Sequence, residues 1–140
     1  MKKLLFLIIA TFTFVTLSAD VNAETFYDVY VDNVRLSDVN STISVGGGTV
    51  SYNDSTKELT LNGITLNASN YAINLTNTTD EVKVIVKGNN TITALGNLFG
   101  IRSSNKVIIT GDGKLTIKSG WACIQGKQVI IDGADVDFTT

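Results

Sequence analysis

The chain has 140 residues with 11 basic and 13 acidic side chains, a formal net charge of −2, and therefore no basic excess of the kind that nucleic-acid-binding proteins carry. It contains no histidine, which excludes His-based catalytic triads, imidazole metal ligation and imidazole pH switches. Its single cysteine, Cys123, excludes an internal disulfide and a thiolate metal cluster.

Residues 1–23 have the three parts of a secretory signal peptide. Two lysines precede an apolar run from Leu4 to Leu17, and the small residues Val21 and Ala23 stand at positions −3 and −1 of a cleavage site. The run is shorter than the roughly 20 residues that a membrane-spanning helix needs, which favours removal over anchorage. We therefore expect a secreted or cell-surface protein that begins at Glu24, without a membrane span after cleavage.

Residues 24–57 are predicted to form an N-terminal β cap. The segment 26–33 alternates as a half-buried strand, and residues 34–36 continue it or pair with it. Residues 49–52 and 58–61 flank a turn at 53–55 and are typical of a hairpin. The glycines 46–48 between these segments are expected to be a flexible break.

From residue 58 onward the chain repeats a unit of 22 to 25 residues. Each unit starts with a short apolar strand that leads into a glycine, and a second short strand follows. A third element closes the first three units with an isoleucine. The apolar residues alternate with a period of two and many are β-branched, which favours strands over helices. The glycines that mark the units are Gly63, Gly88, Gly111 and Gly133.

Three short strands per unit are typical of a solenoid, in which each coil buries its apolar face against the next. We therefore predict an all-β fold, a parallel β-helix of about four coils over residues 58–140, which needs a cap because a solenoid end exposes core and strand edges. Three inward columns are expected: Leu61, Val86, Ile109 and Ile131; Leu66, Ile92, Leu115 and Val136; and Ile73, Ile101 and Ile124.

The last unit is expected to be open at one end. No capping segment follows it, so Val129, Ile131, Val136 and Phe138 would face solvent there. Either this end docks on something, or the chain is a C-terminally truncated version of a longer protein.

Several motifs between residues 26 and 138 resemble those of secreted bacterial proteins. The matching stretches are Tyr30–Val34, Val50–Asn53, Glu58–Gly63, Lys87–Ile92 and Ile109–Ile117. They are similar to the calcium-associated carbohydrate-binding β-helix domain of surface proteins from anaerobic gut and cellulose-degrading bacteria. The resemblance implies a right-handed parallel β-helix of pectate-lyase-like architecture, a bacterial source, and a polysaccharide or cell-wall glycan as partner.

The second strands of the units are predicted to present a glycan-binding face. Outward polar side chains spaced about 4.8 Å apart between coils suit the repeating hydroxyl groups of an extended polysaccharide. Trp121 would stack on a sugar ring if it pointed outward, although inward or edge packing is favoured. The candidate residues are Thr91, Thr93, Lys114, Thr116, Asp135 and Asp137, with Trp121 at the margin.

The densest acidic cluster comprises Asp132, Asp135 and Asp137. Calcium takes six to eight oxygen ligands, several of them carboxylates, so these residues are a candidate calcium site. Alignment of the units, however, places Lys114 beside Asp135 and Thr116 beside Asp137. A solvated cross-strand Lys–Asp pair is therefore favoured over calcium, and no cofactor is required.

Two further features are interpreted as packing. Tyr71 and Phe99 align in successive units and are expected to stack as an aromatic ladder in the core or under a loop. Cys123 aligns with Ala72 and Gly100 at a position that takes small residues, so inert packing is expected.

The sequence favours a protein that is not an enzyme. A lyase would need a base beside carboxylate-bound calcium, but Arg102 and Lys106 lack a clear acidic trio beside them. A glycosidase would need two carboxylates across the scissile bond, and the adjoining Asp80 and Glu81 are weak evidence for that. The main hypothesis is a secreted, non-catalytic carbohydrate-binding β-helix. The alternatives are a structural or adhesive surface module, such as a fragment of a larger adhesin, and a degenerate polysaccharide lyase.

Overall fold

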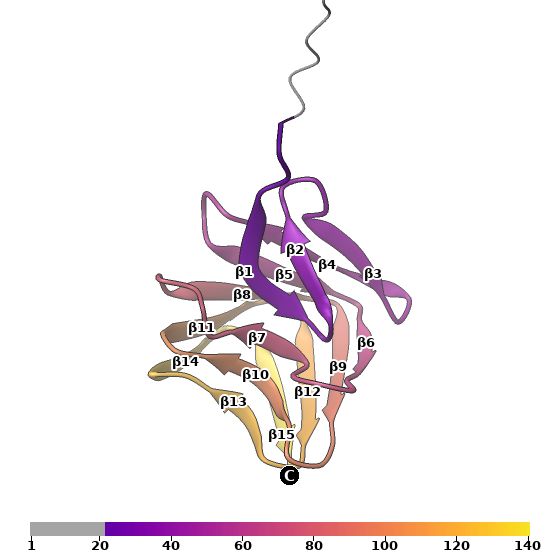
Figure 1. The fold of residues 1–140 in the computed structure, drawn as a ribbon. Coiled ribbons are helices and arrows are strands. Elements are labelled where there is room, and N and C mark those ends of the chain that lie inside the picture. Colours follow the sequence, from indigo (N-terminus) through magenta and orange to yellow (C-terminus); the bar gives the residue numbers. More distant parts are fainter. Residues whose placement is uncertain (1–21) are drawn as a thin grey trace, which may run out of the picture.

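The computed structural model describes residues 22–140, so the predicted signal peptide lies outside the described residues except for its last two positions (Figure 1). The described part contains 15 strands in three sheets and no helix. Accordingly, residues 22–140 include no helix long and apolar enough to cross a membrane.

The strands stack as a parallel β-solenoid with three strands per turn, as the repeat predicted. There are about three full turns and the start of a fourth. The expectation of about four coils is therefore slightly too high, because the fourth turn has two strands in the described chain. The turns are β5 (Glu58–Asn62), β6 (Thr65–Asn67) and β7 (Ile73–Leu75); β8 (Val82–Lys87), β9 (Asn89–Ala94) and β10 (Phe99–Ser103); β11 (Lys106–Gly111), β12 (Lys114–Ser119) and β13 (Ala122–Gln125); then β14 (Gln128–Asp132) and β15 (Asp135–Thr139).

The third inward column is confirmed, since Ile101 lies opposite both Ile73 and Ile124. The other two columns are correct in direction but wrong in register between the second and third turns. Val86 lies opposite Gly111 rather than Ile109, which lies opposite Val84.

The second column has the same two-residue error, because Ile92 lies opposite Ile117 rather than Leu115. A two-residue shift leaves every side chain on its own side of the sheet. The apolar pattern therefore could not reveal it. Alignment by glycines assumed that Gly111 lies opposite Gly88, but Gly111 lies opposite Val86 within the strand, and Gly113 is the glycine that packs against Gly88.

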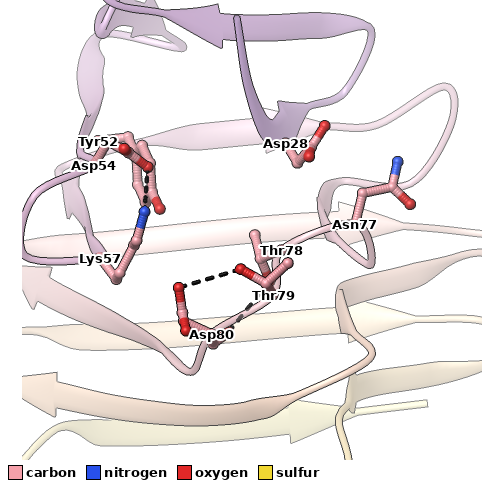
Figure 2. Close-up of a pocket in the computed structure, with 8 residues that line it drawn as sticks. All are labelled: Asp28, Tyr52, Asp54, Lys57, Asn77, Thr78, Thr79 and Asp80. Atoms are coloured by element: carbon pink, nitrogen blue, oxygen red, sulfur yellow. Dashed lines mark hydrogen bonds and ion pairs between the residues drawn. The ribbon is translucent and has the colours of Figure 1, made fainter.

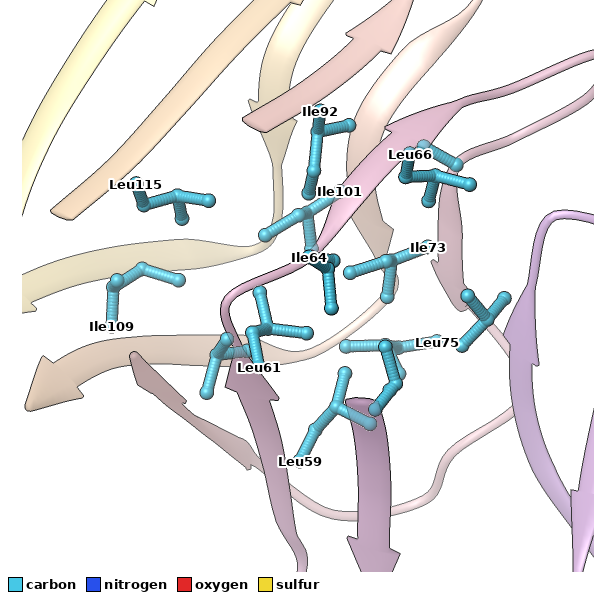
Figure 3. Packing of buried hydrophobic residues seen from close by; sticks show 14 of the residues in the cluster. Leu59, Leu61, Ile64, Leu66, Ile73, Leu75, Ile92, Ile101, Ile109 and Leu115 are labelled. Atoms are coloured by element: carbon cyan, nitrogen blue, oxygen red, sulfur yellow. The ribbon is translucent and has the colours of Figure 1, made fainter. Parts of the chain in front are cut away.

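The aliphatic side chains of the three sheets meet inside the coil, as Figure 3 shows for side chains that include Leu61, Ile73 and Ile109. All three are fully buried, as are most members of the predicted columns. Burying such a side chain stabilises a fold by roughly 1.5–3 kcal/mol. Because one coil cannot enclose these residues alone, their burial depends on the stacking of neighbouring turns.

The first four strands extend two of the three sheets at one end of the solenoid, where they form an antiparallel cap (Figure 1). One hairpin pairs antiparallel with β7, and the predicted hairpin across residues 53–57 joins the cap to β5. These antiparallel pairings occupy strand edges that the first turn would otherwise leave open. The cap strands are β1 (Phe26–Val31), β2 (Val34–Ser37), β3 (Thr42–Val45) and β4 (Gly48–Asn53).

The expectation of a flexible break at the three glycines is wrong. Val45 pairs with Gly48 across a two-residue turn at Gly46 and Gly47, whose φ angles of +53° and +90° suit a tight hairpin turn. A Cβ at Gly46 would lie 1.9 Å from the carbonyl oxygen of Thr65. The glycines therefore let the β3–β4 turn pack closely on β6, the edge strand of the third sheet.

The last layer of strands, β13, β14 and β15, has no neighbouring strand on one side within residues 22–140, as predicted. We call this layer the open rung. Ile131 is 46% exposed, whereas Ile109, its partner in β11, is fully buried. Phe138 is exposed in the same way, and its partner Ile117 is fully buried. The difference arises because no strand of the described chain lies beyond β13, β14 and β15.

Candidate functional site

Six of the seven predicted glycan-binding residues lie on the sheet formed by β6, β9, β12 and β15. Thr91, Thr116 and Asp137 form one row across three strands, and Lys114 and Asp135 belong to the next. Thr93 lies opposite Lys118 in a third row. The structure thus brings the strand residues of the predicted set onto one sheet, while Trp121 lies outside it.

Lys114 holds the two carboxylates that were candidates for calcium. Its Nζ lies 2.5 Å from Asp137 and 3.6 Å from Asp135. The bond to Asp137 and the charge of both carboxylates raise the pKa of the Lys114 ammonium above its ordinary value. This is the cross-strand pair favoured from the sequence, extended to a second aspartate.

This arrangement does not fit a calcium site at Asp132, Asp135 and Asp137. An ammonium group occupies the position between two of the carboxylates, where the cation would need their oxygens. Across residues 22–140, no three acidic, cysteine or histidine side chains are grouped in a way that could hold a metal ion.

An aromatic ladder runs along one corner of the solenoid. The ring centroids of Tyr71 and Phe99 are 6.1 Å apart, and those of Phe99 and Trp121 are also 6.1 Å apart. These spacings fall within the range of stabilising aromatic pairs. The predicted stacking of Tyr71 on Phe99 is therefore observed, at a half-buried position rather than in the core. We call these three residues the aromatic ladder.

Trp121 is 63% exposed and its ring lies beside that of Phe99, so edge packing, one of the two placements favoured from the sequence, is found and inward packing is not. The two residues before it fix the backbone at this corner. Ser119 is buried and donates its hydroxyl to the carbonyl of Leu98 at 2.7 Å, and a Cβ at Gly120 would lie 2.0 Å from the carbonyl oxygen of Gly96. The backbone is therefore tightly held at the corner, and the indole lies at the edge against Phe99.

Arg102 lies over the aromatic ladder, with its guanidinium carbon 5.1 Å from the Tyr71 centroid and 5.2 Å from that of Phe99. Its Nε donates to Gln125 at 3.1 Å. Lys106 forms an ion pair with Glu81. Of the two bases considered for a lyase, Arg102 thus packs on aromatic rings and Lys106 is paired with a carboxylate.

A second site was missed from the sequence, at the junction of the cap with the first two turns. An open groove of about 610 Å³ and a smaller cavity of about 90 Å³ adjoin at Tyr52 and Asp54. Figure 2 shows the side chains that surround the smaller cavity, which include Asp28 from β1 and Asp80 from the loop before β8. We call the two together the cap groove.

Tyr52 forms the wall shared by both parts of the cap groove. It is 5% exposed, and its ring packs edge-on against Tyr27 with centroids 5.4 Å apart. Burial, followed by the negative charge of Asp54, raises the pKa of the Tyr52 phenol to about 12. The phenol therefore stays neutral at all ordinary pH values.

Polar side chains complete the wall around Tyr52. Lys57 forms an ion pair with Asp54 at 2.6 Å, and its φ of +54° is unusual for a residue other than glycine. Asp80 accepts a hydrogen bond from the Thr79 hydroxyl at 3.2 Å. The sequence placed Asp80 only in a loop, and no motif connected it with residues of the cap.

Cys123 packs in the core, where it is buried and unpaired. Its sulfur lies 3.4 Å from the carbonyl oxygen of Ile117. This is the packing role that its alignment with Gly100 indicated.

Comparisons with family models, with curated proteins and with solved structures gave no match for this chain. The β-solenoid is established by the strand topology itself. The carbohydrate-binding character implied by the motifs has to be argued from the surface.

Proposed function

We propose that the protein is a secreted, non-catalytic carbohydrate-binding β-solenoid that acts at a bacterial cell surface or outside the cell. The observation that carries this proposal is the aromatic ladder ending in the exposed Trp121. A flat ring with one free face binds the apolar face of a sugar, while its other face is supported by a neighbouring ring. Trp121 offers such a face, whereas Arg102 lies over the rings of Tyr71 and Phe99, so a sugar would stack at the exposed end of the aromatic ladder.

The neighbouring polar side chains support the same function. Arg102 and Gln125 lie on strands β10 and β13 beside the aromatic ladder and offer hydrogen-bond donors for hydroxyl groups. The rows that contain Thr91, Thr116 and Lys114 repeat from strand to strand, which suits an extended ligand. Because each contact is weak, affinity would come from many contacts along one glycan chain.

Replacing Trp121 with alanine is expected to weaken binding to an insoluble glycan by about tenfold, because an exposed aromatic side chain that stacks on the ligand carries a large share of the binding energy. The measurement is a pull-down on cellulose, pectin and peptidoglycan with and without a calcium chelator. The chelator is expected to have no effect, because Lys114 already holds Asp135 and Asp137.

The matched control is Val39→Ala, which removes an exposed apolar side chain of the cap and should leave binding unchanged. Equal weakening by both substitutions would contradict a role for the aromatic ladder. Release of unsaturated oligosaccharides by the wild-type protein would show a lyase and overturn the non-catalytic assignment.

Secretion is tested by the mass of the exported protein. We expect cleavage after Ala23, so intact-mass measurement should give Glu24 as the first residue. The fold supports this boundary, because Glu24 accepts a hydrogen bond from the Ser37 hydroxyl and the amide of Thr25 donates to Asp38 at 2.9 Å. Membrane-associated protein that retains residues 1–23 would contradict cleavage.

A structural or adhesive surface module is the second candidate function. The open rung favours it, because the exposed side chains of Val129, Ile131 and Phe138 form an apolar face on strands that have one edge unpaired within residues 22–140. Failure of the protein to bind any of the three glycans would place this function ahead of carbohydrate binding.

A further inference from the structure

The cap groove has two compartments of different size. The larger, at about 610 Å³, falls within the range of small-molecule sites. The smaller, at about 90 Å³, suits a single polar group or a few waters but not a sugar ring. Because Tyr52 and Asp54 line both compartments, one ligand can fill the groove and extend a substituent towards the cavity.

The larger compartment is lined by groups that suit a polyol. Hydroxyl groups donate and accept hydrogen bonds, as sugar hydroxyls do, and the ring of Tyr27 adds an aromatic surface beside them. These hydroxyl and amide side chains come from strands β4 and β5 and from the turn between them, together with one residue that precedes β3. They are Ser41, Ser51, Asn53, Ser55 and Thr60.

The smaller compartment has an excess of negative charge. Asp28 is paired with Arg35 at 2.8 Å, and Asp54 is paired with Lys57 at 2.6 Å. Asp80 takes part in no ion pair within residues 22–140, and its carboxylate accepts a hydrogen bond from the neutral hydroxyl of Thr79. Its carboxylate therefore leaves one negative charge at the cavity without a cationic partner.

The negative charge at the smaller compartment also acts on the phenol of Tyr52. Besides burial, the charges of Asp54 and Asp80 both raise the pKa of the phenol, so the negative potential of the cavity reaches the shared wall. A cationic substituent placed there would be attracted to Asp80 and Asp54, whereas an anionic one would be repelled.

We propose that the cap groove binds an amino sugar, with the ring in the larger compartment and the free ammonium group in the smaller one, next to Asp80. This site is separate from the aromatic ladder, and the inference does not depend on glycan binding there. An amino sugar is favoured over a basic peptide because the larger compartment is lined by hydroxyl groups rather than by an apolar or strand-pairing surface.

The test compares oligomers of glucosamine and of N-acetylglucosamine of equal length, titrated calorimetrically into the mature protein. The glucosamine oligomer should bind about two- to fivefold more tightly, because acetylation removes the charge that the exposed carboxylate of Asp80 recognises. Asp80→Asn should abolish most of this difference while retaining the shape of the side chain. Amide chemical-shift changes should concentrate on β4, β5 and residues 77–80.

The matched control is Asp112→Asn, which removes an exposed carboxylate outside the cap groove and should leave the preference intact. Trp121→Ala should also leave it intact, so failure of this site and failure of the aromatic ladder are distinguishable. Thermal unfolding midpoints verify that each variant is folded. If Asp80→Asn does not fold, Asp80→Glu replaces it, and displacement of the carboxylate by one methylene should reduce the preference.

Three outcomes would overturn the proposal. Equal affinity for the two oligomers would exclude ammonium recognition. Equal losses in Asp80→Asn and Asp112→Asn would show unspecific attraction of a cation to an acidic protein. Displacement of the glucosamine oligomer by a lysine oligomer of the same charge, at equal concentration, would assign the groove to a basic peptide instead.

Discussion

Replacing Ile109 with aspartate is expected to unfold the β-solenoid. Ile109 is fully buried in β11, between Val84 of the second turn and Ile131 of the open rung. The substitution removes apolar packing and places a charge where no partner is available, which costs several kcal/mol. Since small domains are stable by only about 5–15 kcal/mol, urea unfolding should show a loss of most or all of the native state.

Two matched substitutions make the result specific for the inward side of the sheet. Ile108→Asp changes the neighbouring residue, which points outward and is half-buried, and should cost much less. Ile131→Asp changes the partner of Ile109 in the open rung, where the side chain is 46% exposed, and should also be mild. Similar losses in all three variants would show that the assigned inward direction is incorrect.

Replacing Asn90 with alanine is expected to destabilise the stack by about 2–4 kcal/mol, as several buried backbone groups would lose their partner at once. The side chain is almost fully buried. Its Oδ1 accepts from the amide of Ile64 at 3.1 Å, and its Nδ2 donates to the carbonyls of Lys87 at 2.9 Å and Lys114 at 3.3 Å. One amide thus links three successive turns.

Asn89 provides the control, because it has the same chemistry one position earlier and is exposed. Asn89→Ala should change the free energy of unfolding by no more than about 0.5 kcal/mol. Chemical denaturation of both variants measures the difference. Equal stability of the two variants would show that the interturn hydrogen bonds of Asn90 contribute nothing net.

The sequence could predict which side chains of each strand point into the coil, because this depends on a simple period of two residues. Alternation of apolar and polar residues determines which side chains point inward, and Ile73, Ile101 and Ile124 align as expected. Register along the strand has no such signal at steps of two residues, so Val86 was matched with Ile109 instead of Gly111. The three glycines of the cap were interpreted as a flexible break and not as a tight turn, because composition alone does not distinguish the two.

The candidate sites were predicted less completely than the fold. The residues on β9, β12 and β15 could be grouped because strands of a solenoid stack in order. For Trp121 the sequence favoured inward or edge packing without separating the two, because strand parity does not extend into a corner, where Ser119 is buried and the backbone of Gly120 packs against Gly96. The cap groove could not be foreseen, because Tyr52 and Asp80 belong to different parts of the chain and meet only through tertiary packing.

The loops at the corners of the solenoid differ in length, while the strands that they connect keep their pairing. The segment between β7 and β8 carries Asp80 and contributes Thr78 and Thr79 to the cap groove, yet its side chains are not part of the aliphatic core. Insertions and substitutions can therefore accumulate in that segment with little effect on folding. Selection could change what the groove recognises without changing the core, so descendants of one ancestral solenoid could diverge in ligand while they retain the same coil.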